Sequence, residues 1–384
     1  MKRILFFNDS MEVAGTEQLL LDLLNYLVKE DVAITLLLPS FEDKYILLEK
    51  LDKKIDVRYL FPQGTSYMKR KLLENVQIFQ PRLFMKIVGL NLSDYDKVVC
   101  FKESFFARML SKAKCFKVLW IHNILYKHTY ESHSLKEKIS EWLNKKHIRI
   151  SRESYNKFDV TVCVSDACKE SYLDVLHDGE HPKQDIRVIY NAIDLNKVRE
   201  RAEEPIGDLP HDRINFVLIT RVSSEKRIDR LVDSVLRLAG EGYNFHVYIV
   251  GDGVKSYVEN RYPNADLSRH ITYTGFLSNP YPYILQSDWS LCVSERESFS
   301  LVLLESMALN TPVITTDCGG PRNIVDNGNY GILVDNSGDG VYGGMKSVLD
   351  NRNLSEKYST SLSASVKRFE YQGWLSSIKE LLDI

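Results

Sequence analysis

The sequence lacks the long apolar runs that mark a membrane span or a secretory leader. No stretch reaches the ~18 apolar residues of a transmembrane helix. The first apolar run ends at Asn8, too short for the signal-peptide core of about 7–15 residues. The six cysteines form no CxxC pair and no dense framework, which fits a reducing compartment and argues against a zinc site. We therefore expect a cytoplasmic protein.

Net charge is also nearly absent, at −2 over 384 residues. With 44% hydrophobic and 27% charged residues, the composition excludes a disordered or fibrous protein. Single hydrophobic cores stop growing near ~250–300 residues, so this length predicts two domains.

The small net charge conceals a segregation. Residues 60–152 contain 18 Lys and Arg against 7 Asp and Glu, a net of +11, so the remaining residues have a net of −13. Such a stretch indicates an anionic partner, namely nucleic acid, a phosphorylated ligand or an anionic lipid surface. A solvated basic face is the alternative.

Short apolar runs alternate with helical patterns from the first residues. Residues 2–7 and 32–38 read as strands around a helix over 16–29, which is a βαβ beginning. The later runs are apolar throughout, as in parallel sheets buried on both faces. They lie at 97–101, 117–121, 160–164 and 186–189. This pattern predicts a Rossmann-like first domain over 1–190.

The same pattern restarts in the second half and predicts a second Rossmann-like domain over 191–370. A loop is expected over 199–212, which contains two prolines and a glycine. An amphipathic helix over about 371–384 either caps the second domain or crosses back onto the first. The expected strands are 215–220, 244–250, 290–293, 312–315 and 331–334, with helices over 228–239 and 298–308. The fold class is therefore α/β, with two facing doubly wound domains and a ligand cleft at the carboxyl ends of their sheets.

The first candidate constellation is a pair of glutamates near the end of the third of these strands, 290–293. Glu297 is expected at the strand's carboxyl end and Glu305 one or two turns into the next helix, whose start offers the N–H groups of Ser300 and Leu301. Carboxylates accept hydrogen bonds from sugar or ribose hydroxyls, and a helix start suits a diphosphate. Two unrelated surface glutamates are the alternative.

Two further candidates follow strands. Arg221 and Lys226, after the strand at 215–220, could clamp a pyrophosphate, although ion pairs with Glu225 or Asp229 would explain them as well. Gly15, in a turn after the first strand, allows close backbone approach to an anion. The GxGxxG dinucleotide fingerprint is absent.

Together these residues resemble the retaining glycosyltransferases of the GT4 type, which have the GT-B fold. The resemblance covers nearly the whole chain. It rests on Glu297 and Glu305 with their neighbours in 294–308, and on the segments 189–194, 250–253, 311–314 and 319–321.

The resemblance implies a nucleotide-sugar donor, with UDP favoured, and a hexosyl or N-acetylhexosaminyl transfer that needs no metal and no cofactor. Glu305 would hold the ribose and Glu297 the sugar ring. Arg221 and Lys226, aided by Ser300, Leu301 and Gly15, would neutralise the diphosphate. His122 would approach the donor sugar, although an ordinary buried histidine is the alternative. Phe276 and Leu277 would line the base.

The resemblance also implies an acceptor that is a lipid-linked or polymeric saccharide of the cell surface. Residues 136–152 combine cations with Ile139, Trp142 and Leu143, as in a helix that rests on an anionic membrane, so a peripheral position on the inner membrane face is expected. An ordinary surface helix is the alternative. Asp94-Tyr95-Asp96 precedes a strand and reads as a turn rather than a metal site.

Two other functions remain open. A nucleotide-sugar epimerase would share the fold and the diphosphate site. A non-catalytic nucleic-acid-binding protein would explain the basic stretch, but no aromatic-interleaved basic platform accompanies it, so no nucleic-acid partner is expected.

Overall fold

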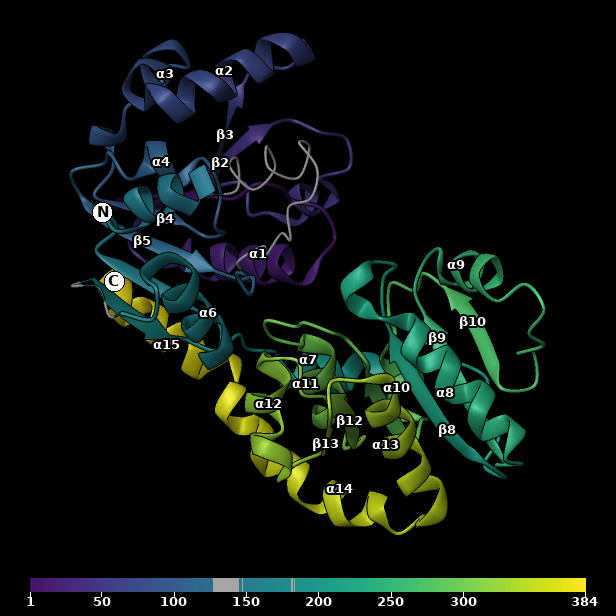
Figure 1. The fold of residues 1–384 in the computed structure, drawn as a ribbon. Coiled ribbons are helices and arrows are strands. Elements are labelled where there is room, and N and C mark those ends of the chain that lie inside the picture. The colour runs from purple at the N-terminus through teal and green to yellow at the C-terminus, as the bar shows by residue number, and fades with distance from the viewer. Residues whose placement is uncertain (127–144, 147, 181, 183) are drawn as a thin grey trace. The chain divides into compact units, whose positions relative to one another are not determined.

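A computed structural model describes residues 1–126, 145, 146, 148–180, 182 and 184–384 (Figure 1). The chain divides into two compact units. Unit 1 comprises Met1–Tyr190 with Leu375–Ile384, and unit 2 comprises Asn191–Trp374. Both are α/β, and every strand pair among the described residues is parallel. The predicted class of two doubly wound, Rossmann-like domains is confirmed.

In its described residues, unit 1 has a seven-stranded sheet in the order β3-β2-β1-β4-β5-β6-β7. The order reverses between β1 and β4, which makes this the switch point of the sheet. The strands are β1 Lys2–Phe7, β2 Val32–Ser40, β3 Asp56–Phe61, β4 Lys97–Cys100, β5 Phe116–Ile121, β6 Val160–Cys163 and β7 Asp185–Val188. The helices are α1 Gly15–Leu27, α2 Tyr67–Phe79, α3 Pro81–Ile87, α4 Ala107–Leu110 and α6 Asp166–His177.

In unit 2 the described strands form a six-stranded sheet in the order β10-β9-β8-β11-β12-β13, with its switch point between β8 and β11. The strands are β8 Ile214–Ile219, β9 Phe245–Val250, β10 Ile271–Gly275, β11 Trp289–Cys292, β12 Val313–Thr316 and β13 Ile332–Val334. The helices are α7 Leu195–Ala202, α8 Ile228–Gly240, α9 Val254–Arg261, α10 Tyr281–Leu285, α11 Leu301–Ala308, α12 Gly320–Ile324, α13 Gly338–Asp350 and α14 Leu354–Ser365. Helix α15, Tyr371–Leu382, begins in unit 2 and continues into unit 1.

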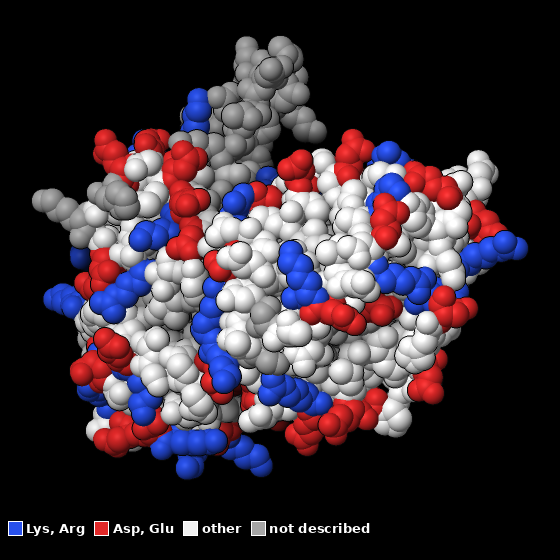
Figure 2. All heavy atoms as spheres, turned by 90° about the horizontal axis from the view of Figure 1, so that it is seen from below, with Lys and Arg blue, Asp and Glu red and all other residues white. Residues whose placement is uncertain are grey.

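The cores follow the apolar runs of the sequence. Phe216, Val247 and Leu291 lie on neighbouring strands of the second sheet and are buried, and the apolar face of α8 covers them with Leu231 and Val235. Most of the described charged residues remain outside, and Glu17, Lys117 and Arg230 are exceptions that are buried. On the face drawn in Figure 2, side chains of both signs lie next to one another in small groups.

One expectation about the connection between the units is wrong. Residues 199–202, expected in a loop, end helix α7. The Asp194 carboxylate caps this helix by accepting from the N–H groups of Asn196 and Lys197, both at 3.1 Å. Leu195, Val198 and Ala202 recur at helical spacing and are buried, which anchors the helix despite its charged outer face.

At 94–96 both acidic residues accept hydrogen bonds. Asp94 ends a short 3-10 helix and accepts from Asn91, and Asp96 accepts from the Arg3 N–H at 2.7 Å. None of the described helices has the length and apolarity that a membrane crossing requires.

Candidate functional site

The site lies in unit 2, where the carboxyl ends of β8 and β11 are neighbours at the switch point. Open α/β sheets bind ligands outside this point because the connecting helices diverge there and leave a crevice. Two loops meet here, 220–227 after β8 and 293–300 after β11, and the N–H of Glu295 donates to the carbonyl of Glu225 at 2.7 Å. The fold therefore brings together segments about 70 residues apart.

Lys226 and Glu297 form an ion pair across these loops. Both side chains are shielded but reachable, with 26% and 16% of their surfaces exposed. Burial alone would lower the pKa of Lys226, but the adjacent Glu297 carboxylate outweighs it, and the pKa is raised. The pair therefore places a fixed positive charge beside a hydrogen-bond acceptor at the sheet's edge, a combination suited to a ligand with both phosphate and hydroxyl groups.

The position of Glu297 is fixed by the loop that follows β12. The N–H of Glu297 donates to the Cys318 carbonyl at 2.9 Å, and the N–H of Gly320 donates to the Glu297 carbonyl at 2.8 Å. Gly320 has to be glycine for this approach, because a Cβ there would lie 2.0 Å from the Ser298 carbonyl oxygen. The observed bounds of β11 and α11 correct two expectations from the sequence. Glu297 lies five residues beyond β11 rather than at its end, and the helix begins at Leu301 rather than at 298.

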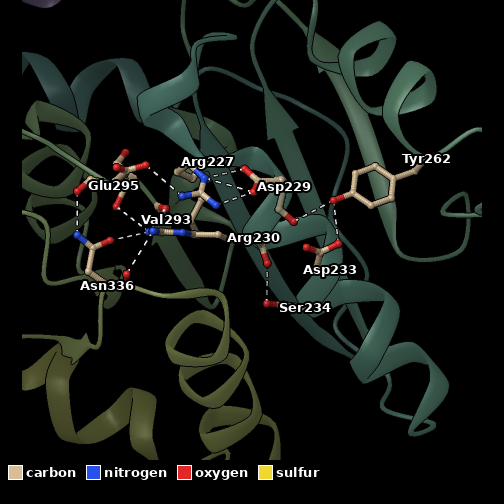
Figure 3. A network of polar contacts seen from close by, with 10 residues as sticks. Arg227, Asp229, Arg230, Asp233, Ser234, Tyr262, Val293, Glu295 and Asn336 are labelled. Atoms are coloured by element: carbon tan, nitrogen blue, oxygen red, sulfur yellow. Dashed lines mark hydrogen bonds and ion pairs between the residues drawn. The ribbon is translucent and has the colours of Figure 1, made fainter. Parts of the chain in front are cut away.

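Two arginines beside Lys226 hold the loops in place (Figure 3). Arg227, with a left-handed backbone of φ 45°, pairs with Asp229 and reaches Glu295 at 3.0 Å. Arg230, on α8, is buried and donates to the Asn336 side chain at 2.6 Å, while the Asn336 amide donates to the Glu295 carbonyl at 2.8 Å (Figure 3). Neither arginine was predicted from the sequence, although Arg227 directly follows Lys226. They tie the loop after β11 to α8 and to the segment after β13.

Glu305 lies on α11, the helix that follows this loop. Its carboxylate accepts from the Tyr281 hydroxyl at 2.9 Å. Burial raises the pKa of Glu305 above its ordinary value, although the hydrogen bond from Tyr281 and the charge of Arg201 oppose the rise. Arg201 also lies over the Tyr281 ring, 5.2 Å from its centroid. Tyr281 and Arg201 were missed, because they belong to α10 and to the helix mistaken for a loop.

The remaining predicted residues of unit 2 lie around this centre. Ser300 is the N-cap residue of α11 and Leu301 is its first residue, so the N–H groups predicted to face an anion do open a helix. Arg221 is exposed on the same loop as Lys226. Phe276 and Leu277 follow the edge strand β10, two strands away from β8, and Phe276 is exposed.

Gly15 and His122 belong to unit 1. Gly15 is the exposed first residue of α1. His122 follows β5 and is only 4% exposed, yet neither ring nitrogen has a hydrogen-bond partner of ordinary geometry among the described residues. Burial, with a smaller contribution from Lys102, lowers the pKa of His122 to about 3. The ring is therefore neutral at physiological pH, with one nitrogen able to donate and one able to accept.

His122 lies within a cluster of polar residues at the carboxyl edge of the first sheet, most of which were not predicted from the sequence. Glu103, after β4, accepts from the backbone N–H of His122 at 2.8 Å, and burial raises the pKa of the Glu103 carboxyl. Lys102 pairs with the buried Glu17 at 3.2 Å. Burial also raises the pKa of Asp9, after β1, although a hydrogen bond from Ser104 opposes it. The sequence feature that could have revealed this cluster is a charged residue soon after each of two apolar strands, β1 and β4, which are neighbours at the switch point.

The fold and site define a protein of two Rossmann-like domains with polar groups gathered at the switch point of each sheet. Two family models match it, "Glycosyltransferase Family 4" over residues 13–197 and "Glycosyl transferases group 1" over residues 200–361. The chain belongs to the GT4-type glycosyltransferases and has the GT-B fold.

The chain is also similar to curated glycosyltransferases, over about half of its length. The chain is 28% identical over 187 residues, 48% of its length and 49% of the relative's, to the N-acetylgalactosamine-N,N'-diacetylbacillosaminyl-diphospho-undecaprenol 4-alpha-N-acetylgalactosaminyltransferase of Campylobacter jejuni. It is 28% identical over 211 residues, 52% of its length and 51% of the relative's, to the capsular polysaccharide biosynthesis glycosyltransferase CapM of Staphylococcus aureus. The matches thus span about half of these relatives.

Among solved structures, the Anabaena protein Alr3699/HepE in complex with UDP and glucose has a TM-score of 0.75. The structural match covers the whole of both chains, at 18% sequence identity. This likeness establishes the fold.

Proposed function

We propose that this protein is a retaining glycosyltransferase that moves a hexose or an N-acetylhexosamine from a UDP-sugar to a saccharide acceptor. The observation that carries the proposal is the Lys226–Glu297 pair at the switch point of the second sheet. A nucleotide sugar combines a diphosphate with two sets of hydroxyl groups, so it needs a cation, an anion site and carboxylates close together. Glu305, the helix start at Ser300 and Leu301, and Arg221 complete that set.

The departing nucleoside diphosphate gains negative charge in the transition state. Lys226 and Arg221 stabilise that charge, and Lys226 does so without reorganisation, because Glu297 and the buried surroundings already orient it. Glu297 accepts from the sugar hydroxyls and Glu305 from the ribose hydroxyls. The leaving phosphate takes the proton of the incoming hydroxyl on the same face of the sugar, which retains its configuration. These protein cations make the transfer independent of a metal and of any further cofactor.

Unit 1 supplies the acceptor side in this proposal. Asp9 and Glu103 offer carboxyl oxygens that suit the hydroxyl groups of a saccharide acceptor. His122 keeps the role expected from the sequence, in which its neutral ring offers a nitrogen to the donor sugar. The Campylobacter relative is named for an undecaprenol-linked substrate and the Staphylococcus relative for capsular polysaccharide, which supports a lipid-linked or polymeric acceptor in cell-surface glycan synthesis.

We further propose a peripheral position on an anionic membrane through the basic segment 60–152. The helix predicted over 136–152 falls largely outside the described residues, so the support from that element is its sequence alone.

A panel of UDP-, GDP- and dTDP-sugars in a thermal-shift assay tests the donor. A ligand at about 100 times its Kd stabilises the folded state by about 2.7 kcal/mol, so one UDP-sugar should raise the Tm by several degrees. The variant Lys226→Gln should lose most of this shift, whereas Lys255→Gln, which removes an exposed cation from α9, should keep it. A panel in which no nucleotide sugar shifts the Tm would contradict the proposal.

An epimerase of the same fold would use the same donor site. NMR of the UDP-sugar after incubation separates the two functions, since an epimerase inverts a ring centre without an acceptor. A transferase leaves the sugar unchanged or releases it with its anomeric configuration retained.

A further inference from the structure

The carboxylate of Glu305 has one oxygen bound within the protein and one open to a ligand. Its Oε1 accepts from the Tyr281 hydroxyl at 2.9 Å, and no other side chain among the described residues donates to it. An ionised carboxylate can accept about four hydrogen bonds on its two oxygens. Because the Glu305 side chain is partly exposed, Oε2 remains able to accept from a ligand.

The Tyr281 side chain is held at this position from two sides. The Asn279 side chain accepts from the Tyr281 N–H at 3.3 Å and donates to the Arg201 carbonyl at 2.7 Å. The Arg201 guanidinium donates to the Ser278 carbonyl at 2.7 Å, and it lies 5.2 Å from the centroid of the Tyr281 ring. A cation over an aromatic ring is attracted to its face, which limits how the ring can turn. Tyr281 is therefore fixed to the end of α7 as well as to its own helix.

The same two residues favour the ionised form of Glu305. Burial raises the pKa of Glu305, whereas the hydrogen bond from Tyr281 and the positive charge of Arg201 oppose the rise. They come from α10 and α7, and among the described residues they are the groups whose charge or hydrogen bonding acts on this carboxylate. Arg199, also on α7, instead donates to the Ala308 carbonyl of α11 at 3.3 Å. An ionised carboxylate accepts at both oxygens, whereas a protonated one turns one of them into a donor.

An acceptor oxygen held in this way suits a ribose. The 2′ and 3′ hydroxyls of a ribose are adjacent donors, and a charged acceptor whose direction is set beforehand binds them without first losing the freedom of its side chain. The bond between Tyr281 and Glu305 is not needed to anchor α10, because Pro282 and Ile284 of this helix are already buried. Its effect therefore falls on the carboxylate rather than on the helix.

We propose that Tyr281 and Arg201 are positioning residues for recognition of the ribose. The Tyr281 hydroxyl holds Oε1 of Glu305, Oε2 faces the ribose hydroxyls of the donor, and Arg201 acts through the Tyr281 ring. Neither side chain has to touch the nucleotide. This inference rests on the proposed function, which assigns the ribose to Glu305. It adds that the site selects ribonucleotides and that this selectivity depends on two residues behind the carboxylate.

Isothermal titration calorimetry with UDP and with 2′,3′-dideoxy-UDP, which lacks both ribose hydroxyls, tests the proposal. The full chain should bind UDP about thirtyfold more tightly than the dideoxy analogue, because the analogue leaves the charged acceptor Glu305 without donors. Tyr281→Phe should weaken UDP binding about tenfold and leave binding of the analogue unchanged, which reduces the preference to about threefold. Arg201→Gln should reduce the preference by about threefold.

The pH dependence of UDP binding gives a second readout. Protonation of Glu305 removes an acceptor, so UDP binding should weaken as pH falls through the pKa of this residue. Tyr281→Phe and Arg201→Gln each remove a contribution that opposes the rise of the Glu305 pKa, so in both variants the affinity should begin to fall at a higher pH than in the parent. The phosphates of UDP titrate in every sample alike, so the difference between variant and parent reports on the protein.

Matched controls come from the same unit. Tyr283→Phe removes a hydroxyl from the same helix, but the Tyr283 ring packs against Tyr248 rather than against Glu305. Arg352→Gln removes an exposed cation from the loop before α14. Both variants should match the parent in UDP affinity, in preference over the dideoxy analogue and in pH profile. Thermal melts of all four variants, with the titrations run well below the transitions, exclude unfolding as the cause of a loss.

Equal weakening of UDP and of the dideoxy analogue by Tyr281→Phe would reduce Tyr281 to a structural contact between α10 and α11 and overturn the proposal. A parent that binds both nucleotides equally tightly would also overturn it, while its binding of UDP would still support the proposed function. If the parent binds GDP but not UDP, the UDP assignment fails, and the same comparison with 2′,3′-dideoxy-GDP decides the role of Tyr281. Binding of neither nucleotide would reject both the proposed function and this inference.

Discussion

The substitution Gly320→Ala tests the link between the loop after β12 and the carboxylate of Glu297. The added Cβ would lie 2.0 Å from the Ser298 carbonyl oxygen and 2.5 Å from its carbon. Contacts under 3.0 Å essentially do not occur for a Cβ, and both obstacles are backbone atoms that cannot rotate away. The two loops must therefore separate by about 1 Å, a displacement that can reduce catalysis about a hundredfold.

Stability should fall too, since forcing an extra carbon into packed structure costs about 1–3 kcal/mol. For a domain of this size that corresponds to a fall of roughly 2–12 °C in Tm. The assay is kcat/KM for hydrolysis or transfer of the UDP-sugar found in the panel, measured at a temperature well below the unfolding transitions of both proteins. A thermal melt of the same samples gives the change in Tm.

Gly343→Ala is the matched control. Gly343 lies within α13, and a Cβ there meets nothing within 4 Å, so helix propensity alone should keep or raise the Tm by a small amount. Activity should not change. If Gly320→Ala turned over donor within about threefold of the parent, at an unaltered Tm, the inferred dependence of Glu297 on this close approach would be refuted.

Three further predictions concern single side chains. Glu297→Ala should abolish transfer and leave the protein folded, as seen by circular dichroism; full activity would reject the assigned role. Burial raises the pKa of Glu305 above 4.5, so ionising it destabilises the fold as pH rises through and beyond that value. Glu305→Gln should remove this part of the pH dependence of unfolding and weaken UDP binding, and an unchanged pH profile would count against it. With its pKa lowered to about 3, His122 should remain neutral in NMR titrations down to about pH 4. Stability should then fall as pH drops from 6.5 toward 3, which a histidine that titrates near 6.5 would disprove.

The sequence was sufficient for the central strands because they are buried on both faces and appear as continuous apolar runs. β1 and β8 were placed within one residue of their observed ends. The edge strand β3 was missed, since only part of it is buried and Asp56 and Arg58 interrupt the apolar pattern. Helix α7 was missed because its charged residues and the nearby prolines outweigh three buried positions.

The site was only partly predictable for a different reason. Lys226 and Glu297 were named, but their contact depends on β8 and β11 being neighbours, and strand order is set by tertiary packing rather than by local pattern. The same holds for Arg230 and Asn336, which lie 106 positions apart in the chain. Asp9 and Glu103 were not predicted, because no local sequence pattern shows that β1 and β4 are adjacent.

The division of α15 between the units has a consequence for the order of events during synthesis. Leu375, Ile378 and Leu382 are buried, and they belong to the unit that begins at Met1. The Lys379 ammonium pairs with Glu30 at 2.8 Å, joining positions 349 residues apart. Domains usually fold as they leave the ribosome, N-terminal first. Here the core of unit 1 cannot be completed until residues 375–384 have been synthesised, which happens only after the whole of unit 2 has been translated.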